Sequence, residues 1–200
     1  MAKYKIAVTG GIGSGKSLAI TIFKELGIKT ISCDDISREI YKDDAVLNQV
    51  VSAFGVGVLT KGGKVSRKAL SDLVFSDKAK LQILNGITHP AIIKKMRAFL
   101  NSEPSFVAVA EVPLLFECGL QDDFDQVIVL KRPLNDRIKS VCIRSGLSEE
   151  DVIKRIKNQF DYESLKNNAY TIINNDGDAD KLRQQIRCVL SEIDKKFKHN

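Results

Sequence analysis

Short apolar runs alternate with amphipathic segments along this chain, and the alternation predicts strands connected by helices. One run, Phe106–Val112, is nearly continuous in apolar residues, as expected for a strand buried on both faces of a parallel sheet. The pattern therefore predicts an α/β fold with a five-stranded parallel sheet flanked by helices. The predicted strands are Tyr4–Val8, Ile28–Cys33, Phe106–Val112, Val127–Lys131 and Tyr170–Asn174.

The alternation is interrupted over residues 43–104, where apolar positions follow a helical period. We expect one helix through residues 46–54, a turn at Lys61–Lys64 and a second helix capped by Ser66. A third helix is predicted over residues 77–87, and a fourth begins at His89-Pro90. These residues form a predicted helical insertion between the second and third strands.

Two more helices are predicted between the fourth and fifth strands. Pro133 fits the first turn of the first helix, and Gly146 fits its C-cap. Ser148 and Asp151 form a capping box for the second helix, whose apolar positions continue to Phe160.

Two arginines lie on the first of these helices. Arg137 and Arg144 are seven positions apart and therefore share one helical face. Helices that present arginine at this point are typical of a kinase lid that closes over a triphosphate. The alternative is a solvated basic face without a ligand.

Composition narrows the class of protein. The 200 residues include 31 lysines and arginines and 25 acidic residues, giving a net charge of +6, but basic runs are short and aromatics are only 6%. This balance favours polyphosphate ligands over nucleic acid. Four cysteines without C-x-x-C spacing and only two histidines argue against zinc and disulfides. Without a signal peptide or a membrane-length apolar run, we expect a cytoplasmic protein that does not bind membranes. No feature of the sequence specifies an oligomeric state.

The most informative stretch follows the first strand, where Gly10–Ser17 spells G-x-x-x-x-G-K-S, a phosphate-binding P-loop. Glycines allow successive N–H groups to turn inward as an anion nest, and the positive end of the next helix faces the same phosphates. Lys16 is expected to bridge the β- and γ-phosphates, and the Ser17 hydroxyl to ligate Mg²⁺.

Two other interpretations of this stretch are weaker. An incidental glycine-rich turn does not account for the strand before it or for the amphipathic helix from Leu18 to Leu26 after it. A dinucleotide fingerprint read from Gly11 places Lys16 where its last glycine belongs. The loop therefore predicts a nucleoside triphosphate site.

Acidic residues follow two neighbouring strands. Asp34 and Asp35 follow the second strand, where an acid can accept the proton of a hydroxyl that attacks the γ-phosphate, or can simply N-cap the next helix. The residues alone leave both roles open. Glu111, near the end of the third strand, occupies the position of a Walker B acid that acts on Mg²⁺ through water; pairing with a lysine is the alternative.

Several motifs together resemble dephospho-coenzyme A kinases over most of the chain, in order and spacing. The P-loop alone indicates only a kinase or NTPase, whereas the Pro113–Glu117 block P-L-L-F-E and the His89-Pro90 pair narrow the family. The remaining matches are Thr9 before the loop, Asp34 with Arg38, Arg67 through Leu70 to Phe75, Arg144, Gln159, and Asn175 before Gly177.

The resemblance implies a P-loop NTPase core, a helical acceptor domain and a lid. It also implies ATP-dependent phosphorylation of the ribose 3′-hydroxyl of dephospho-CoA, the last step of coenzyme A synthesis, with ATP as cosubstrate and Mg²⁺ as cofactor. The implied segments are residues 1–42, 105–132 and 169–200 for the core, 43–104 for the acceptor insertion and 133–168 for the lid.

The resemblance also implies roles for individual residues. The family's D-A-D motif falls on Ser32-Cys33-Asp34, which makes Asp34 the base and leaves Asp35 as a cap or bystander. Catalytic roles are implied for Asp34, Lys16 and Arg144. ATP contacts are implied for Gly11, Ile12, Gly13, Ser14, Gly15, Lys16, Ser17, Leu18, Arg137, Arg144 and Asn175. Contacts to dephospho-CoA are implied for Asp34, Arg67, His89, Pro113, Leu114 and Leu115.

This chain departs from the family pattern at four positions. Ser32 replaces the first aspartate of D-A-D, and Leu18 replaces a threonine. Ser140 stands where relatives often carry arginine, and Tyr170 replaces an aspartate.

The alternative functions are those of a nucleoside monophosphate kinase or another small-metabolite kinase, a regulatory GTPase, which would need an N-K-x-D motif, and a nucleic-acid-binding ATPase. The Asn174–Gly177 stretch lacks the lysine of N-K-x-D.

Overall fold

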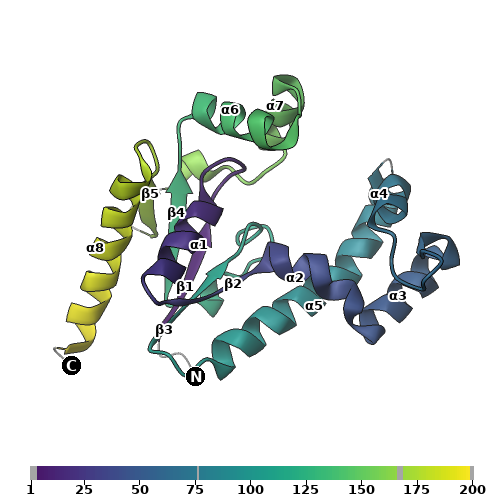
Figure 1. The fold of residues 1–200 in the computed structure, drawn as a ribbon, viewed down its shortest axis with the longest axis horizontal. Helices are drawn as coiled ribbons and strands as arrows, with labels where there is room; N and C mark the ends of the chain where they lie inside the picture. Colours follow the sequence, from purple (N-terminus) through teal and green to yellow (C-terminus); the bar gives the residue numbers. More distant parts are fainter. Residues whose placement is uncertain (1–3, 76, 166–168, 199–200) are drawn as a thin grey trace. The chain divides into compact units, whose positions relative to one another are not determined.

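A computed structural model describes residues 4–75, 77–165 and 169–198 (Figure 1). The first three residues of the predicted core, the last three of the predicted lid and the last two of the chain lie outside this description. The chain divides into two compact units, a helical unit of Ser32–Asn101 and a core unit formed by residues 1–31 and 102–200. None of the described helices is both long and apolar enough to cross a membrane.

The core unit contains the five-stranded sheet that the sequence predicts. Its strands are β1 (Tyr4–Thr9), β2 (Lys29–Ser32), β3 (Val107–Glu111), β4 (Gln126–Lys131) and β5 (Thr171–Asn174), in the order β2-β3-β1-β4-β5. β1 pairs in parallel with β3 and β4, and β4 with β5. Because β1 lies at the centre, the loop that follows it opens between the carboxyl ends of β3 and β4, where ligands bind in open α/β sheets.

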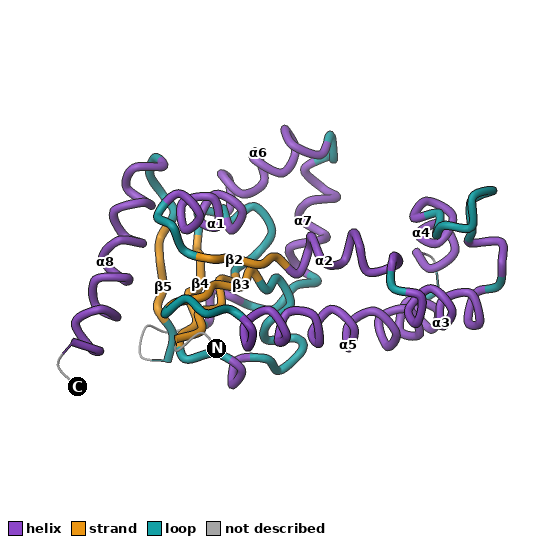
Figure 2. Tube along the Cα trace, turned by 60° about the horizontal axis from the view of Figure 1, so that its bottom comes forward, coloured by secondary structure: helices purple, strands orange, loops and turns teal. Residues whose placement is uncertain are grey.

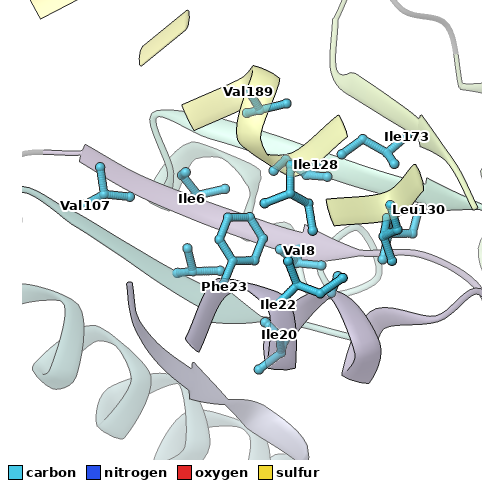
Figure 3. Close-up of a cluster of buried hydrophobic side chains, with 14 of the residues drawn as sticks. Ile6, Val8, Ile20, Ile22, Phe23, Val107, Ile128, Leu130, Ile173 and Val189 are labelled. Atoms are coloured by element: carbon cyan, nitrogen blue, oxygen red, sulfur yellow. The ribbon is translucent and has the colours of Figure 1, made fainter. Parts of the chain in front are cut away.

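Two helices cover one face of this sheet. They are α1 (Lys16–Glu25) and α8 (Ala179–Lys198), and they contact each other as well as the strands (Figure 1). Figure 3 shows Phe23 of α1 beside Ile6 and Val8 of β1, with Val189 of α8 close to Ile128. Burial of such side chains is the main stabilising term for the core unit, each contributing about 1.5–3 kcal/mol.

The predicted lid region contains α6 (Leu134–Ser145) and α7 (Glu149–Lys157), followed by the 3₁₀ turn η4 (Tyr162–Ser164). Gly146 ends α6 in the left-handed conformation, and the Ser148 side chain caps α7 by accepting from Asp151 N, as predicted. Phe160, however, lies beyond the end of α7, so the predicted helix is too long. The short 3₁₀ turn η3 (Gln121–Asp123) precedes β4.

The helical unit contains α2 (Cys33–Glu39), η1 (Ile40–Lys42), α3 (Asp44–Phe54), η2 (Val56–Val58), α4 (Arg67–Phe75) and α5 (Lys78–Ser102) (Figure 2). Its own apolar core includes Ile40, Val50 and Leu70, all almost completely buried. Ser66 caps α4 by accepting from Ala69 N at 3.3 Å, which confirms the predicted cap.

The predicted break before His89 is wrong, because α5 continues from Lys78 to Ser102 with Pro90 inside it. A proline inside a helix removes one hydrogen bond and crowds the carbonyl of the residue four positions earlier. The helix nevertheless continues, because apolar residues on both sides of the proline are held in the unit: Leu84 and Met96 are both buried. The residue four positions earlier is Gly86, where a Cβ would meet nothing within 4 Å.

We therefore expect Pro90→Ala to raise the free energy of unfolding by about 1–3 kcal/mol, because it restores a helical N–H where proline is costly. Urea unfolding followed by circular dichroism measures this change. Pro133→Ala is the matched control, since Pro133 stands at the N-cap of α6, outside the helix interior. A less stable Pro90→Ala variant would mean that a helix begins at this proline after all.

Candidate active site

The glycine-rich loop occupies the six positions between β1 and α1, and its glycines adopt conformations that other residues avoid. Gly10, Gly13 and Gly15 have φ values of 145°, 77° and 97°. Gly15 is the N-cap of α1, and no side chain caps that helix. The first N–H groups of α1 are therefore directed to the loop, where they suit an anion.

Neighbouring segments press against this loop so closely that its glycines have no room for a side chain. A Cβ at Gly13 would lie 2.7 Å from the carbonyl oxygen of Arg137, and one at Gly15 would collide with the Asn175 amide. A Cβ at Gly11 would overlap the Arg137 guanidinium. Contacts with α6 and with the turn after β5 therefore contribute to the shape of the loop.

Lys16 folds back over the loop. Its Nζ donates to the carbonyl oxygens of Gly10 at 2.8 Å and Gly11 at 3.2 Å. The ammonium group is thereby held on the loop within reach of an anion bound there.

Arg137 is the buried arginine of the predicted lid, with 6% of its surface exposed. Its Nε donates to Ile12 O at 2.9 Å, and its Nη1 lies 3.6 Å from Glu163. Burial lowers the pKa of Arg137, and the Glu163 carboxylate opposes that shift. A solvated basic face is therefore the wrong interpretation for Arg137. Arg144, two turns further along α6, is exposed.

Two amide side chains complete the enclosure of the loop. Asn175 is buried, and its Nδ2 donates to Ser14 O at 2.9 Å. Gln159, which belongs to the family resemblance but had no assigned role, accepts from Ile12 N at 2.8 Å. Its position after α7 gave no signal that it would contact the loop.

Ser17 and Glu111 are the two oxygen donors predicted for Mg²⁺, and they lie on α1 and β3. Ser17 is exposed in the first turn of α1, and Glu111 is buried at the end of β3, paired in register with Val8. A hydroxyl, a carboxylate and phosphate oxygens are ligands that suit Mg²⁺. Among the described residues no group of three or more His, Cys, Asp or Glu side chains could hold a metal ion.

A hollow of about 530 Å³ adjoins the loop at the carboxyl ends of β4 and β5. Arg137 and Glu163 form one part of its wall, and Asn174 and Asp176, on either side of Asn175, form another. The remaining lining residues are Lys131, Arg132, Pro133, Leu134 and Ile156.

The Pro113–Glu117 block follows β3 as a series of turns. Leu115 is completely buried, whereas Leu114 is 40% exposed, so only Leu114 of these two side chains is open to a ligand. The carbonyl of Pro113 accepts from the Tyr162 hydroxyl at 3.0 Å.

The predicted acids lie at the start of α2 in the helical unit. Neither is the cap: the Ser32 side chain accepts from Asp35 N at 3.4 Å, so the capping role proposed for the aspartates is wrong. Asp35 instead pairs with Arg38 at 2.8 Å, and Asp34 is exposed. An exposed carboxylate in the first turn is available to a substrate.

The other two predicted acceptor residues also belong to the helical unit. Arg67 is the exposed first residue of α4, and its charge opposes the rise that burial causes in the pKa of Tyr41. Burial lowers the pKa of His89, which favours the neutral form of this imidazole.

Comparison with known proteins identifies the family. The sequence profile described as CoaE, dephospho-CoA kinase, matches residues 4–181. The chain belongs to the dephospho-CoA kinase family. The family's activity, phosphotransfer in the final step of coenzyme A biosynthesis, is thereby assigned, with ATP and dephospho-CoA as substrates.

Relatives and solved structures of this family agree with the match. A dephospho-CoA kinase of Carboxydothermus hydrogenoformans is 34% identical over 191 residues, covering 94% of this chain and 93% of the relative. The structure of the dephospho-CoA kinase from Campylobacter jejuni has a TM-score of 0.70 and 34% identity, covering 98% of this chain and 99% of the other. The crystal structure of TT1252 from Thermus thermophilus has a TM-score of 0.82 and 29% identity, covering 96% and 98%.

The enclosed loop makes a testable prediction. We expect Gly15→Ala to weaken ATP binding by about tenfold or more, because alanine is strained at this φ and its methyl collides with Asn175. Adding Asn175→Ala removes the collision and should recover part of the affinity. Titration with a fluorescent ATP analogue measures both variants, and Gly57→Ala, in open space, is the control. Equal affinities for Gly15→Ala and the wild type would contradict this packing.

Proposed function

We propose that the core unit binds ATP through the loop and transfers its γ-phosphoryl group in line to the ribose 3′-hydroxyl of dephospho-CoA. The observation that carries this proposal is the loop itself: an uncapped helix N-terminus with Lys16 held over it. Phosphoryl transfer needs mainly positioning and charge stabilisation, and both are features of this arrangement.

The nucleotide contacts that we propose follow the loop and its enclosure. The N–H groups from Gly11 to Leu18 bind the phosphates, and Lys16 stabilises charge on the transferred group. Arg137 already lies against the loop, and we propose that Arg144, exposed on the same helix, also contacts ATP. The hollow beside Asn175 has the position to receive the nucleoside, and its wall combines apolar side chains such as Leu134 and Ile156 with charged ones such as Arg137.

Mg²⁺ is part of this proposal. Ser17 would hold it, and Glu111 would act on it through bound water. When bound, the metal neutralises charge on the β- and γ-phosphates. We place no nucleic acid or membrane among the partners.

The acceptor contacts that we propose involve the residues that the family resemblance singles out. We propose that Asp34 orients and deprotonates the 3′-hydroxyl, and that Arg67 and His89 contact dephospho-CoA within the 43–104 insertion. Because the neutral form of His89 is favoured, it would hydrogen-bond the substrate, whereas Arg67 would pair with its phosphates. The Pro113–Leu115 stretch would contact dephospho-CoA through Leu114 and the backbone.

An ADP-release assay over a panel of acceptors tests the substrate. Dephospho-CoA should give ADP well above the rate with ATP alone, and nucleoside monophosphates should not. A signal with a nucleoside monophosphate and none with dephospho-CoA would overturn the proposal.

We expect Asp34→Asn to lower kcat by about 10²–10⁴, the usual contribution of a general base, with ATP affinity unchanged. The same assay measures kcat, and a nucleotide titration measures affinity. Asp35→Asn is the matched control, since Asp35 is the neighbouring acid and pairs with Arg38. If Asp34→Asn turns over at the wild-type rate, Asp34 is not the base.

A further inference from the structure

Five residues after α7 contact several elements at the nucleotide end of the core unit. This return segment, Gln159–Glu163, contacts the middle of the loop through Gln159 and Ile12. Its last residue, Glu163, pairs with Arg137 and lies 3.9 Å from Lys131 at the end of β4. The segment therefore joins the loop, α6 and the sheet.

The return segment also binds the Pro113–Glu117 block. Phe160 N donates to Glu117 Oε1 at 3.2 Å, and the rings of Phe160 and Phe116 stack with centroids 4.6 Å apart. Tyr162 packs edge-on against both rings. Aromatic pairs in such geometry stabilise each other, so the block and the return segment are held together as one layer.

One hydroxyl connects this layer to the start of the loop. Tyr162 is 4% exposed, and its hydroxyl donates to Pro113 O at 3.0 Å. The same oxygen lies 3.3 Å from the hydroxyl of Thr9, the completely buried last residue of β1. A tyrosine has one hydroxyl proton, so Thr9 must be the donor in the second bond.

The result is a series of two hydrogen bonds, in which Thr9 donates to Tyr162 and Tyr162 donates to Pro113. Burial raises the pKa of Tyr162 to about 12, so the hydroxyl keeps its proton at any physiological pH. Thr9 directly precedes Gly10, the first residue of the loop, and Pro113 begins the block to which we assigned acceptor contacts. These two hydrogen bonds therefore link the phosphate loop to the proposed acceptor block within the core unit.

We propose that Tyr162 is a positioning residue that couples acceptor binding at the Pro113–Glu117 block to the conformation of the phosphate loop. This inference rests on the proposed acceptor contacts of that block. Removing the hydroxyl keeps the ring packing but leaves Thr9 and Pro113 without their shared partner. Each ligand alone still binds, whereas binding of one no longer favours the other.

The test is a coupling measurement by calorimetry. The dissociation constant of dephospho-CoA is measured with and without a non-hydrolysable ATP analogue in magnesium buffer, and the reciprocal titration is also made. In the wild type we expect each ligand to tighten the other by about 5–150-fold, the usual range of coupling between two sites. In Tyr162→Phe the factor should fall severalfold, equally in both directions, with single-ligand affinities near wild type.

Two further variants make the result specific. Thr9→Val removes the hydroxyl that donates to Tyr162 and should therefore lower the coupling factor by the same amount. The double variant, with both Thr9→Val and Tyr162→Phe, should lose no more coupling than either single variant. Tyr170→Phe is the matched control, because Tyr170 packs on Phe116 in the same ring cluster and should keep the wild-type coupling factor.

The outcomes separate the inference from the proposed function. One outcome is a wild type that phosphorylates dephospho-CoA and yet shows no coupling between the two ligands. Another is a wild type that shows the same coupling as Tyr162→Phe and Thr9→Val. Either result overturns the role of Tyr162 and leaves the proposed function standing. Loss of both single-ligand affinities in these variants indicates a merely structural role and also overturns it. A wild type that does not bind dephospho-CoA overturns both.

Discussion

The phosphate loop depends on close contact between its glycines and three segments that are remote in sequence. Gly10 lies against the Leu130 carbonyl of β4, Gly13 against Arg137 of α6 and Gly15 against Asn175 after β5. No side chain fits at any of these points, so the loop owes its shape to its surroundings as well as to its own flexibility. Any element that moves α6 or the β5 turn therefore acts on the loop.

The sequence predicted the features that arise from local chemistry. The five strands, the Gly10–Ser17 loop and the caps at Ser66 and Ser148 each depend on neighbouring residues, and the structure confirms them. The continuity of α5 through Pro90 was not predictable in this way, because burial of Leu84 and Met96 outweighs the local cost of the proline.

The site could be predicted only where a motif marks it. Lys16 and Asn175 belong to recognisable patterns, and the side chains of both donate hydrogen bonds to carbonyl oxygens of the loop. Tyr162 and Glu163 belong to no pattern, and their contacts with Thr9 and Arg137 join positions far apart in the chain. Spacing placed Arg137 and Arg144 on one helical face, but only tertiary structure shows that Arg137 is buried and Arg144 exposed.

The contacts of the two loop cations bear on the proposed phosphate binding, because they order these side chains before any ligand binds. Lys16 donates to the carbonyl oxygens of Gly10 and Gly11, and Arg137 is held by the carbonyl oxygen of Ile12 and by the Glu163 carboxylate. Fixing a long cationic side chain costs about 1.5–2 kcal/mol of rotamer entropy. Because these two side chains are already ordered in the folded protein, ligand binding does not add this entropy loss. A phosphate oxygen is charged and accepts a stronger hydrogen bond than a carbonyl oxygen does. Preorganisation of this kind favours the triphosphate and leaves the choice of acceptor to residues outside the loop.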